Sequence, residues 1–298
     1  MKIRVGFGLG ARTGVDDQPR YRLMVDELER LQFDSLWVSE RITAPGPDPI
    51  VAMSIAAART ERLKFGMSVM VLPGRNPVIT AKELASLDVL SGGRLLPAFG
   101  LGAVNAAEHQ AFGVDRSERA AIFNESLGLM RRLWTEDHVT HEGARFSIDD
   151  VTVRPKPLQQ PLEVWLGGIA PSELRRVGRL ADGWIPSFVT PADVDAGIAE
   201  VNRHAAENDR AIDPEHHGVL IPYANQPIDD AVLAFIGARR PELDPRQLVA
   251  TSLDDLVSMI NRFIEVGASK FVAVPFAPLG DITAELVELS DAVRPLEN

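Results

Sequence analysis

The sequence contains no cysteine, which excludes several kinds of chemistry at once. Disulfide bonds, thiolate nucleophiles, iron–sulfur clusters and cysteine-type zinc sites cannot form anywhere in the 298 residues. The chain also lacks an uncharged apolar stretch of the roughly 18 residues that a membrane-spanning helix needs. Its first residues, Met1-Lys2-Ile3-Arg4-Val5-Gly6, lead into an apolar run too short for a secretory signal. We therefore expect a soluble, cytoplasmic protein that does not act at a membrane.

Positive charge is also scarce. The 31 Lys and Arg residues are outnumbered by 42 Asp and Glu residues, and the formal net charge is −11 at pH 7. Nucleic-acid phosphates would be repelled by such a chain, and its basic runs are no longer than pairs such as Arg131-Arg132. The six histidines show no spacing typical of a zinc or iron site. We expect neither nucleic-acid binding nor a required metal.

Short apolar runs alternate with stretches of helical periodicity along most of the chain. The alternation predicts eight strands, at residues 3–8, 35–38, 63–71, 95–100, 163–167, 183–186, 218–222 and 270–275. Between them, apolar residues recur at helical spacing, as at Met24, Leu28 and Leu31. No linker rich in Gly, Ser or Pro divides the pattern. The sequence therefore predicts an α/β fold in which residues 1–298 form a single (β/α)8 TIM barrel, rather than two open sheets.

Residues 137–157 interrupt this alternation. They lack helical periodicity and end in a proline-rich run. Val139 and His141, and again Phe146 and Ile148, are spaced two residues apart, which is the period of a strand. We predict an inserted hairpin around residues 137–157. The segment 225–245 mixes prolines with charge clusters, so its pattern separates helix from loop poorly.

Glycines gather where the predicted strands end, the edge at which TIM barrels carry their active sites. They occur in Gly8-Leu9-Gly10, Gly100-Leu101-Gly102 and Gly167-Gly168. Glycine permits a close backbone approach to a ligand, and exposed amides there can hold a phosphate. Apolar side chains dominate the expected rim, which favours an apolar or aromatic substrate: Phe7, Met70, Leu72, Phe99, Trp184 and Phe188.

Four segments of the sequence carry a more specific pattern. The longest is LPGRNPV at residues 72–78 running into AKELASLDVLSGGR at residues 81–94; the others are FGLG at 99–102, PLEVWLGG at 161–168 and RLADGW at 179–184. Together they resemble the luciferase-like monooxygenase superfamily, in its branch of oxidoreductases that use the deazaflavin coenzyme F420. The resemblance implies a flavin-type ring held against a bulge in the third strand, where this branch has a cis peptide. The matching pair is Ser68-Val69, which we predict to be cis.

The resemblance also implies cofactor contacts, position by position. Glu40 matches an acidic residue that contacts the deazaflavin, and Arg75 could reach the coenzyme's phosphate and glutamate tail in a mouth otherwise short of cations. Without the resemblance, Glu40 could equally pair with Arg41 or Arg59, and Arg75 could be a solvated surface residue. The remaining matched contacts are Ser68, Val69, Val71, Leu101, Gly102, Gly167, Gly168 and Ala170.

Two positions depart from the sugar-phosphate dehydrogenases of this branch. Those enzymes carry a His and a Glu as proton donor and acceptor where this chain has Arg41 and Ala103. Because neither replacement titrates near neutral pH, we do not expect sugar-phosphate oxidation. Arg41 could instead stabilise a developing enolate or bind a substrate carboxylate, and His109 is a candidate proton relay.

Several alternatives stay open. The family also contains FMN-dependent monooxygenases, and the loss of both acid–base residues would suit a cofactor-binding barrel without activity. Residues 8–14, GLGARTG, vary the dinucleotide fingerprint of a nicotinamide enzyme, although helical periodicity begins only after Pro19. A homodimer is a further expectation, because relatives are often dimers and Val51, Met53 and Ile55 lie in a nearly uncharged stretch.

Overall fold

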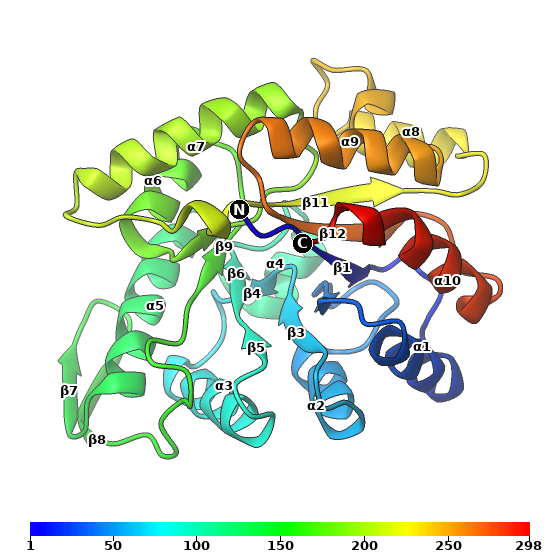
Figure 1. The fold of residues 1–298 in the computed structure, drawn as a ribbon. Coiled ribbons are helices and arrows are strands. Elements are labelled where there is room, and N and C mark those ends of the chain that lie inside the picture. The colour runs from blue at the N-terminus through cyan, green and yellow to red at the C-terminus, as the bar shows by residue number, and fades with distance from the viewer.

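A computed structural model describes residues 1–298, and in it a ring of strands is surrounded by helices (Figure 1). β3 and β4 are two parts of one strand interrupted at Ser68-Val69, and only Pro97 separates β5 from β6. Eight parallel barrel strands result, as predicted. Their bounds are β1 Arg4–Leu9, β2 Ser35–Val38, β3 Lys64–Met67 with β4 Met70–Val71, β5 Leu95–Leu96 with β6 Ala98–Gly100, β9 Trp165–Leu166, β10 Gly183–Trp184, β11 Gly218–Tyr223 and β12 Lys270–Pro275.

The pairing of these strands runs round the ring. One side follows the order β11-β12-β1-β2-β3-β5 and the other the order β10-β9-β6-β4. Bridges from Trp184 to His217 and from Ser187 to Leu220 connect β10 to β11. The predicted TIM-barrel fold is confirmed, and the open sheets of a nicotinamide-binding fold are not what this chain forms.

The helices begin where the sequence supplies both a cap and a proline. Asp48 accepts hydrogen bonds from the amides of Ile50 and Val51, and Asn76 does the same for the next helix. In both cases proline occupies the first turn, where its missing N–H costs nothing. The helices are α1 Gln18–Arg30, α2 Pro49–Arg59, α3 Pro77–Leu90, α4 Ala106–Phe112, α5 Arg119–Thr135, α6 Pro171–Leu180, α7 Pro191–Ala206, α8 Asp230–Gly237, α9 Leu253–Glu265 and α10 Ile282–Val293.

The predicted hairpin is present and lies outside the ring, beside α5 (Figure 1). Its antiparallel strands are β7 Val139–Glu142 and β8 Ser147–Val151. Glu125 of α5 anchors the turn by accepting hydrogen bonds from the amides of Arg145 and Phe146.

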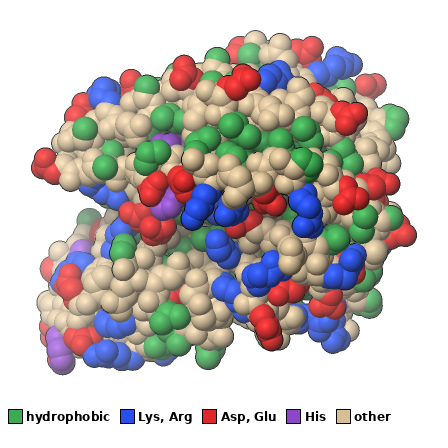
Figure 2. Space-filling model, viewed as in Figure 1, with side chains coloured by type: hydrophobic (Ala, Val, Ile, Leu, Met, Phe, Trp, Pro, Cys, Tyr) green, Lys and Arg blue, Asp and Glu red, His purple; other side chains and the backbone are tan.

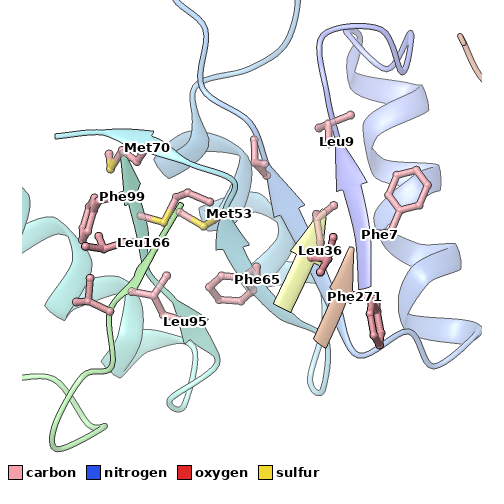
Figure 3. Close-up of a cluster of buried hydrophobic side chains, with 14 of the residues drawn as sticks. Phe7, Leu9, Leu36, Met53, Phe65, Met70, Leu95, Phe99, Leu166 and Phe271 are labelled. Atoms are coloured by element: carbon pink, nitrogen blue, oxygen red, sulfur yellow. The ribbon is translucent and has the colours of Figure 1, made fainter. Parts of the chain in front are cut away.

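Two apolar layers hold the barrel together. The larger lies between strands and helices, where Phe65, Phe99 and Leu166 are buried among their neighbours (Figure 3). The smaller fills the barrel interior with Trp37, Ala98, Trp165, Ile185, Leu220, Val272 and Val274. Gly6 of β1 faces this interior, and a Cβ there would lie 2.5 Å from Ser35 Oγ. The same Cβ would lie 3.1 Å from Trp37 Cδ1, so the glycine makes room for Ser35 and for the Trp37 ring of β2.

The surface carries no helix long and apolar enough to cross a membrane. On the face shown in Figure 2, acidic and basic side chains are interspersed. Both termini lie on this face, and the amide of Ile3 donates to the Asn298 side chain at 3.0 Å.

Gly197 of α7 packs directly on Trp184, and a Cβ there would come within 2.2 Å of the indole ring. We expect Gly197→Ala to lower the free energy of unfolding by about 1–3 kcal/mol, since overpacking outweighs the better helix propensity of Ala. Gly128→Ala in α5 is the control, because no atom lies within 4 Å of its added Cβ. It should leave stability unchanged or higher. Urea denaturation of the two variants measures the difference, and equal stabilities would contradict this packing.

His217 is buried beside Trp184, its ring edge-on at 6.5 Å, and its Nδ1 has no hydrogen-bond partner. Burial, aided by His216, lowers the pKa of His217 from 6.5 to about 4. As the pH falls below 6.5, His217 becomes protonated in the unfolded chain, whereas in the folded chain it stays neutral until about pH 4. The stabilising contribution of neutral His217 should therefore be fully present above pH 6.5. The free energy of unfolding should fall by about 3 kcal/mol as the pH drops to about 4, at about 1.4 kcal/mol per pKa unit. Urea denaturation near neutral pH and near pH 4 should show this loss, and the loss should be smaller in His217→Leu. An unchanged pH dependence in His217→Leu would rule out this assignment.

Candidate active site

A cleft of about 370 Å³ opens at the carboxyl ends of the barrel strands. Its walls are the segments that directly follow β1, β2, β6 and β9, together with residues after β10, β11 and β12. Ile185, Leu220 and Val274 belong both to its lining and to the barrel interior, so the interior core is its floor. The volume falls within the roughly 300–1,000 Å³ typical of small-molecule sites.

Most of the predicted site residues lie in this cleft. Its lining includes Glu40, Arg41, Ser68, Val69, Val71, Leu101, Gly102, Gly167 and Gly168. Arg75, His109 and Ala170 are not part of the lining. The fold thus brings together residues from four different strand ends, as expected of a barrel site.

The interrupted third strand fits closely against the fourth. The Ser68-Val69 peptide is cis, which confirms the prediction. Opposite it, a Cβ on Gly100 would lie 2.4 Å from Val69 Cγ2. Gly102 has a φ of +86°, a conformation that favours glycine. The glycines at 100 and 102 are therefore required by the shape of this wall.

Glu40 is held rigidly at the edge of the cleft. Its side chain is only 2% exposed; Oε2 accepts a 2.6 Å hydrogen bond from the Val71 amide, and Oε1 is ion-paired with Arg75. Burial raises the pKa of Glu40, although Arg75 and the Val71 amide favour its ionised form. Arg75 also donates to the Val71 carbonyl at 3.1 Å. Arg75, rather than Arg41 or Arg59, is thus the partner of Glu40, and this pairing turns its guanidinium away from the cleft lining.

Arg41 lines the cleft and is braced from behind by Glu108 of α4, at 3.5 Å. Glu108 is 2% exposed and also accepts hydrogen bonds from the amides of Ile42 and Thr43. Burial opposes ionisation, but bonds from the Thr43 hydroxyl and from these amides, with the charge of Arg41, hold the pKa of Glu108 below its ordinary value. The carboxylate therefore fixes the loop that presents Arg41.

No histidine lines the cleft. His109, the candidate proton relay, follows Glu108 on α4, and its Nε2 is buried without a hydrogen-bond partner. The hairpin residues His138 and His141 pair separately, with Asp150 and Glu125. No group of three or more His, Asp and Glu side chains is placed to hold a metal ion.

The loop after β9 leads into the first turn of α6. Gly168 has a φ of +98°, and the amides of Ile169 and Ala170 donate to Glu173 at 3.0 Å. Ala170 is thus the N-cap residue of α6 rather than a lining residue. One helical turn beyond Glu173, Arg176 lines the cleft, with its guanidinium 5.6 Å from the Phe123 ring.

Three lining arginines were not predicted from the sequence: Arg12, Arg176 and Arg239. The expectation of a mouth short of cations is therefore wrong. Arg12 follows β1 at the same edge as Gly10, so the strand-end rule could have found it. Arg239 and its neighbour Phe235 lie in the segment 225–245, where the sequence pattern was ambiguous.

The predicted apolar rim is also corrected. Phe99 and Phe188 line the cleft, whereas Phe7, Met70, Leu72 and Trp184 are fully buried and absent from its lining. Alternate residues of a strand face opposite sides, and Phe7 points outward into the helix layer (Figure 3). The aromatic part of the real lining comes instead from Phe123, Phe235 and Phe276, together with Phe99 and Phe188.

Known proteins similar in sequence define the family of this chain. The sequence model of the luciferase-like monooxygenase family matches residues 5–242, and the chain belongs to that family. It is 34% identical over 208 residues to an F420-dependent glucose-6-phosphate dehydrogenase of Intrasporangium calvum, covering 62% of this chain and 61% of the relative. A protein of the same name from Microbacterium testaceum is 26% identical over 281 residues, covering 80% and 82% of the two chains. The chain thus spans less than two thirds of the length of the Intrasporangium relative.

Solved structures share the fold. An F420-dependent secondary alcohol dehydrogenase in complex with an F420–acetone adduct superposes with a TM-score of 0.83 at 21% identity, over 100% of both chains. The FMN-bound oxygenating constituent of 3,6-diketocamphane monooxygenase from Pseudomonas putida gives 0.74 at 16% identity, over 100% of this chain and 98% of the other. Barrels that bind either cofactor therefore share this architecture.

Proposed function

We propose that the protein is a coenzyme F420-dependent oxidoreductase that transfers a hydride between the deazaflavin and a small organic substrate. The observation that carries the proposal is the cleft at the strand ends, where Val69 packs against Gly100 and a second glycine loop lies at Gly167-Gly168. The named relatives of the family use this coenzyme.

The lining fits such a cofactor. A flat ring would lie against Val69, with Leu101 and Gly102 beside it, and Glu40 would contact its edge. The loop at Gly167-Gly168, with Arg176 nearby, offers backbone amides and a cation to the phosphate of the coenzyme. When bound, F420 supplies the two-electron hydride chemistry, and the protein supplies position and charge.

The residues of the cleft favour a reaction without a dedicated acid–base pair. Its carboxylates are Glu40, which is ion-paired with Arg75, and Glu173, which binds two amides of the α6 turn. Arg41 and Ala103 line the cleft, and they are the positions where the family resemblance implies the proton donor and acceptor of the sugar-phosphate dehydrogenases. Sugar-phosphate oxidation is therefore not part of the proposal. The chain's own contribution is to orient the substrate and to stabilise negative charge through Arg41.

Parallel fluorescence titrations with F420 and with FMN test the proposal. Selective binding of F420 at micromolar concentrations or below, followed by hydride transfer to an enone or imine, is the expected result. Selective FMN binding would move the protein to the oxygen-using part of the family. Binding of F420 without transfer to any compound of a broad panel would favour a barrel without activity.

We also propose a homodimer formed through α2. Val51 and Ile55 are 57% and 41% exposed and lie four residues apart on one face of the helix, whereas Met53 is buried in the core. Val51→Glu should yield a monomer in light scattering after gel filtration if this face is the interface. A wild-type protein that is itself monomeric would overturn the proposal.

A further inference from the structure

Arginines collect on one wall of the cleft. Arg12 follows β1, Arg41 follows β2, and Arg239 follows α8 in the segment between β11 and α9. In the ring order, β1 lies opposite β9, and β11 lies opposite β4. Arg12, Arg239 and Phe235 therefore face Gly168 and Val69 from across the cleft, and Arg41 lies near Arg239. We define this wall by Arg12, Arg41, Arg239 and Phe235.

The protein itself leaves two of these cations without an anionic partner. Apart from Arg41, which Glu108 braces, the arginines of this wall contact aromatic rings. The Arg12 and Arg239 guanidinium groups lie 5.1 and 4.7 Å from the centre of the Phe235 ring, and neither makes a side-chain hydrogen bond or an ion pair. Burial and the nearby Arg41 lower the pKa of Arg239. Cations gathered in this way have donors to spare for a bound anion.

The charge of the cleft lining is opposite in sign to the net charge of the whole chain. The chain carries a formal charge of −11, whereas the cleft lining holds four arginines against two glutamates. Both glutamates already have partners, Arg75 for Glu40 and the α6 amides for Glu173. The cleft therefore presents a local positive field that an anionic substrate would experience on approach.

Beside this wall, the cleft lining is apolar and aromatic. Phe188, Phe235 and Phe276 form a cluster with ring centroids 5.9 to 6.5 Å apart. Three serines are the only neutral polar side chains of the whole lining, which has no Asn, Gln, Thr or Tyr. Sugar hydroxyls would find few neutral polar side chains here, whereas a flat hydrocarbon body would pack well against the rings.

We propose that the substrate of this cleft is an organic carboxylate with an apolar, planar body. Its carboxylate binds Arg239 and Arg12, with Arg41 adjoining, and its body lies among the three phenylalanine rings. This inference rests on the proposed function for the position of the coenzyme on the opposite wall, and it adds the class of substrate.

The experiment compares cinnamate with its neutral isostere cinnamamide, by calorimetric titration into protein saturated with F420. The wild type should bind cinnamate about tenfold or more tightly than cinnamamide, because charged hydrogen bonds from arginine are lost in the amide. Arg239→Gln and Arg12→Gln should each weaken cinnamate binding by about tenfold and leave cinnamamide and F420 binding unchanged. Arg22→Gln is the matched control, because Arg22 is an exposed α1 arginine without a partner.

Equal affinities for the two compounds, or no binding of cinnamate at millimolar concentration, would overturn the carboxylate site. Weaker F420 binding in Arg239→Gln and Arg12→Gln would assign these arginines to the coenzyme's own anionic tail and would overturn it as well. If the wild type does not bind F420, the proposed function fails, and the ratio of cinnamate to cinnamamide affinity measured on the free protein still decides the substrate class.

Discussion

Replacing Glu40 by Leu should destabilise the protein by about 3 kcal/mol and abolish tight F420 binding. The change leaves the Arg75 guanidinium, whose side chain is 20% exposed, without its main partner, and leaves the Val71 amide without its acceptor. Asp48, 3.8 Å from Arg75 and 43% exposed, compensates only weakly. Because Val71 belongs to β4, directly after the cis bulge, the loss should reach the surface on which the ring would lie.

Two further variants separate charge from shape. Glu40→Gln keeps an acceptor for the Val71 amide but removes the charge, so its cost should be intermediate, about 1–2 kcal/mol. Asp26→Ala breaks the exposed ion pair with Arg59 and should cost less than about 1 kcal/mol. Denaturant titration and F420 fluorescence measure both properties. A Glu40→Leu protein with wild-type stability and affinity would show that the buried pair has no role in the site.

The order of strands and helices could be predicted because each barrel strand is a short apolar run between turn signals. The strand Lys270–Pro275 was predicted to the residue, and the hairpin was found through its lack of helical periodicity. The break inside the third strand was anticipated only through family resemblance, since nothing in the local pattern of Ser68-Val69 sets it apart from the flanking strand residues.

The direction of each side chain was harder to predict than the strand that carries it. Alternate residues of a strand face opposite sides, and a polar–apolar alternation shows which side is buried. Nearly every strand residue here is apolar, so Phe7 and Trp184 could be assigned to either side. In the structure Trp184 points outward, under Gly197, and its indole N–H donates to the Gly168 carbonyl at 2.8 Å. Similarly, Arg239 and Phe235 reach the cleft only because α8 packs over it, and the local sequence pattern does not predict that packing.

Replacing Gly100 by Ala should weaken F420 binding by about tenfold or more while leaving the barrel folded. The added Cβ would lie 2.4 Å from Val69 Cγ2, closer than any real contact, so Val69 must move. Valine is stiff about χ1, and both routes open to it harm the site: rotation puts a methyl group into the cleft, and backbone movement displaces the bulge. Overpacking of about 1–3 kcal/mol corresponds to a loss of affinity of roughly five- to 150-fold.

A second change distinguishes this clash from a general effect of the substitution. Val69→Ala removes the methyl group that the new Cβ would meet, so the double variant Gly100→Ala/Val69→Ala should recover much of the affinity lost by Gly100→Ala. Fluorescence titration of F420 into the two single variants and the double variant completes the cycle. Additive losses in the double variant would mean that Gly100 is needed for direct contact with the coenzyme; recovery would mean that its role is to let Val69 lie flat against the fourth strand and keep the cleft open.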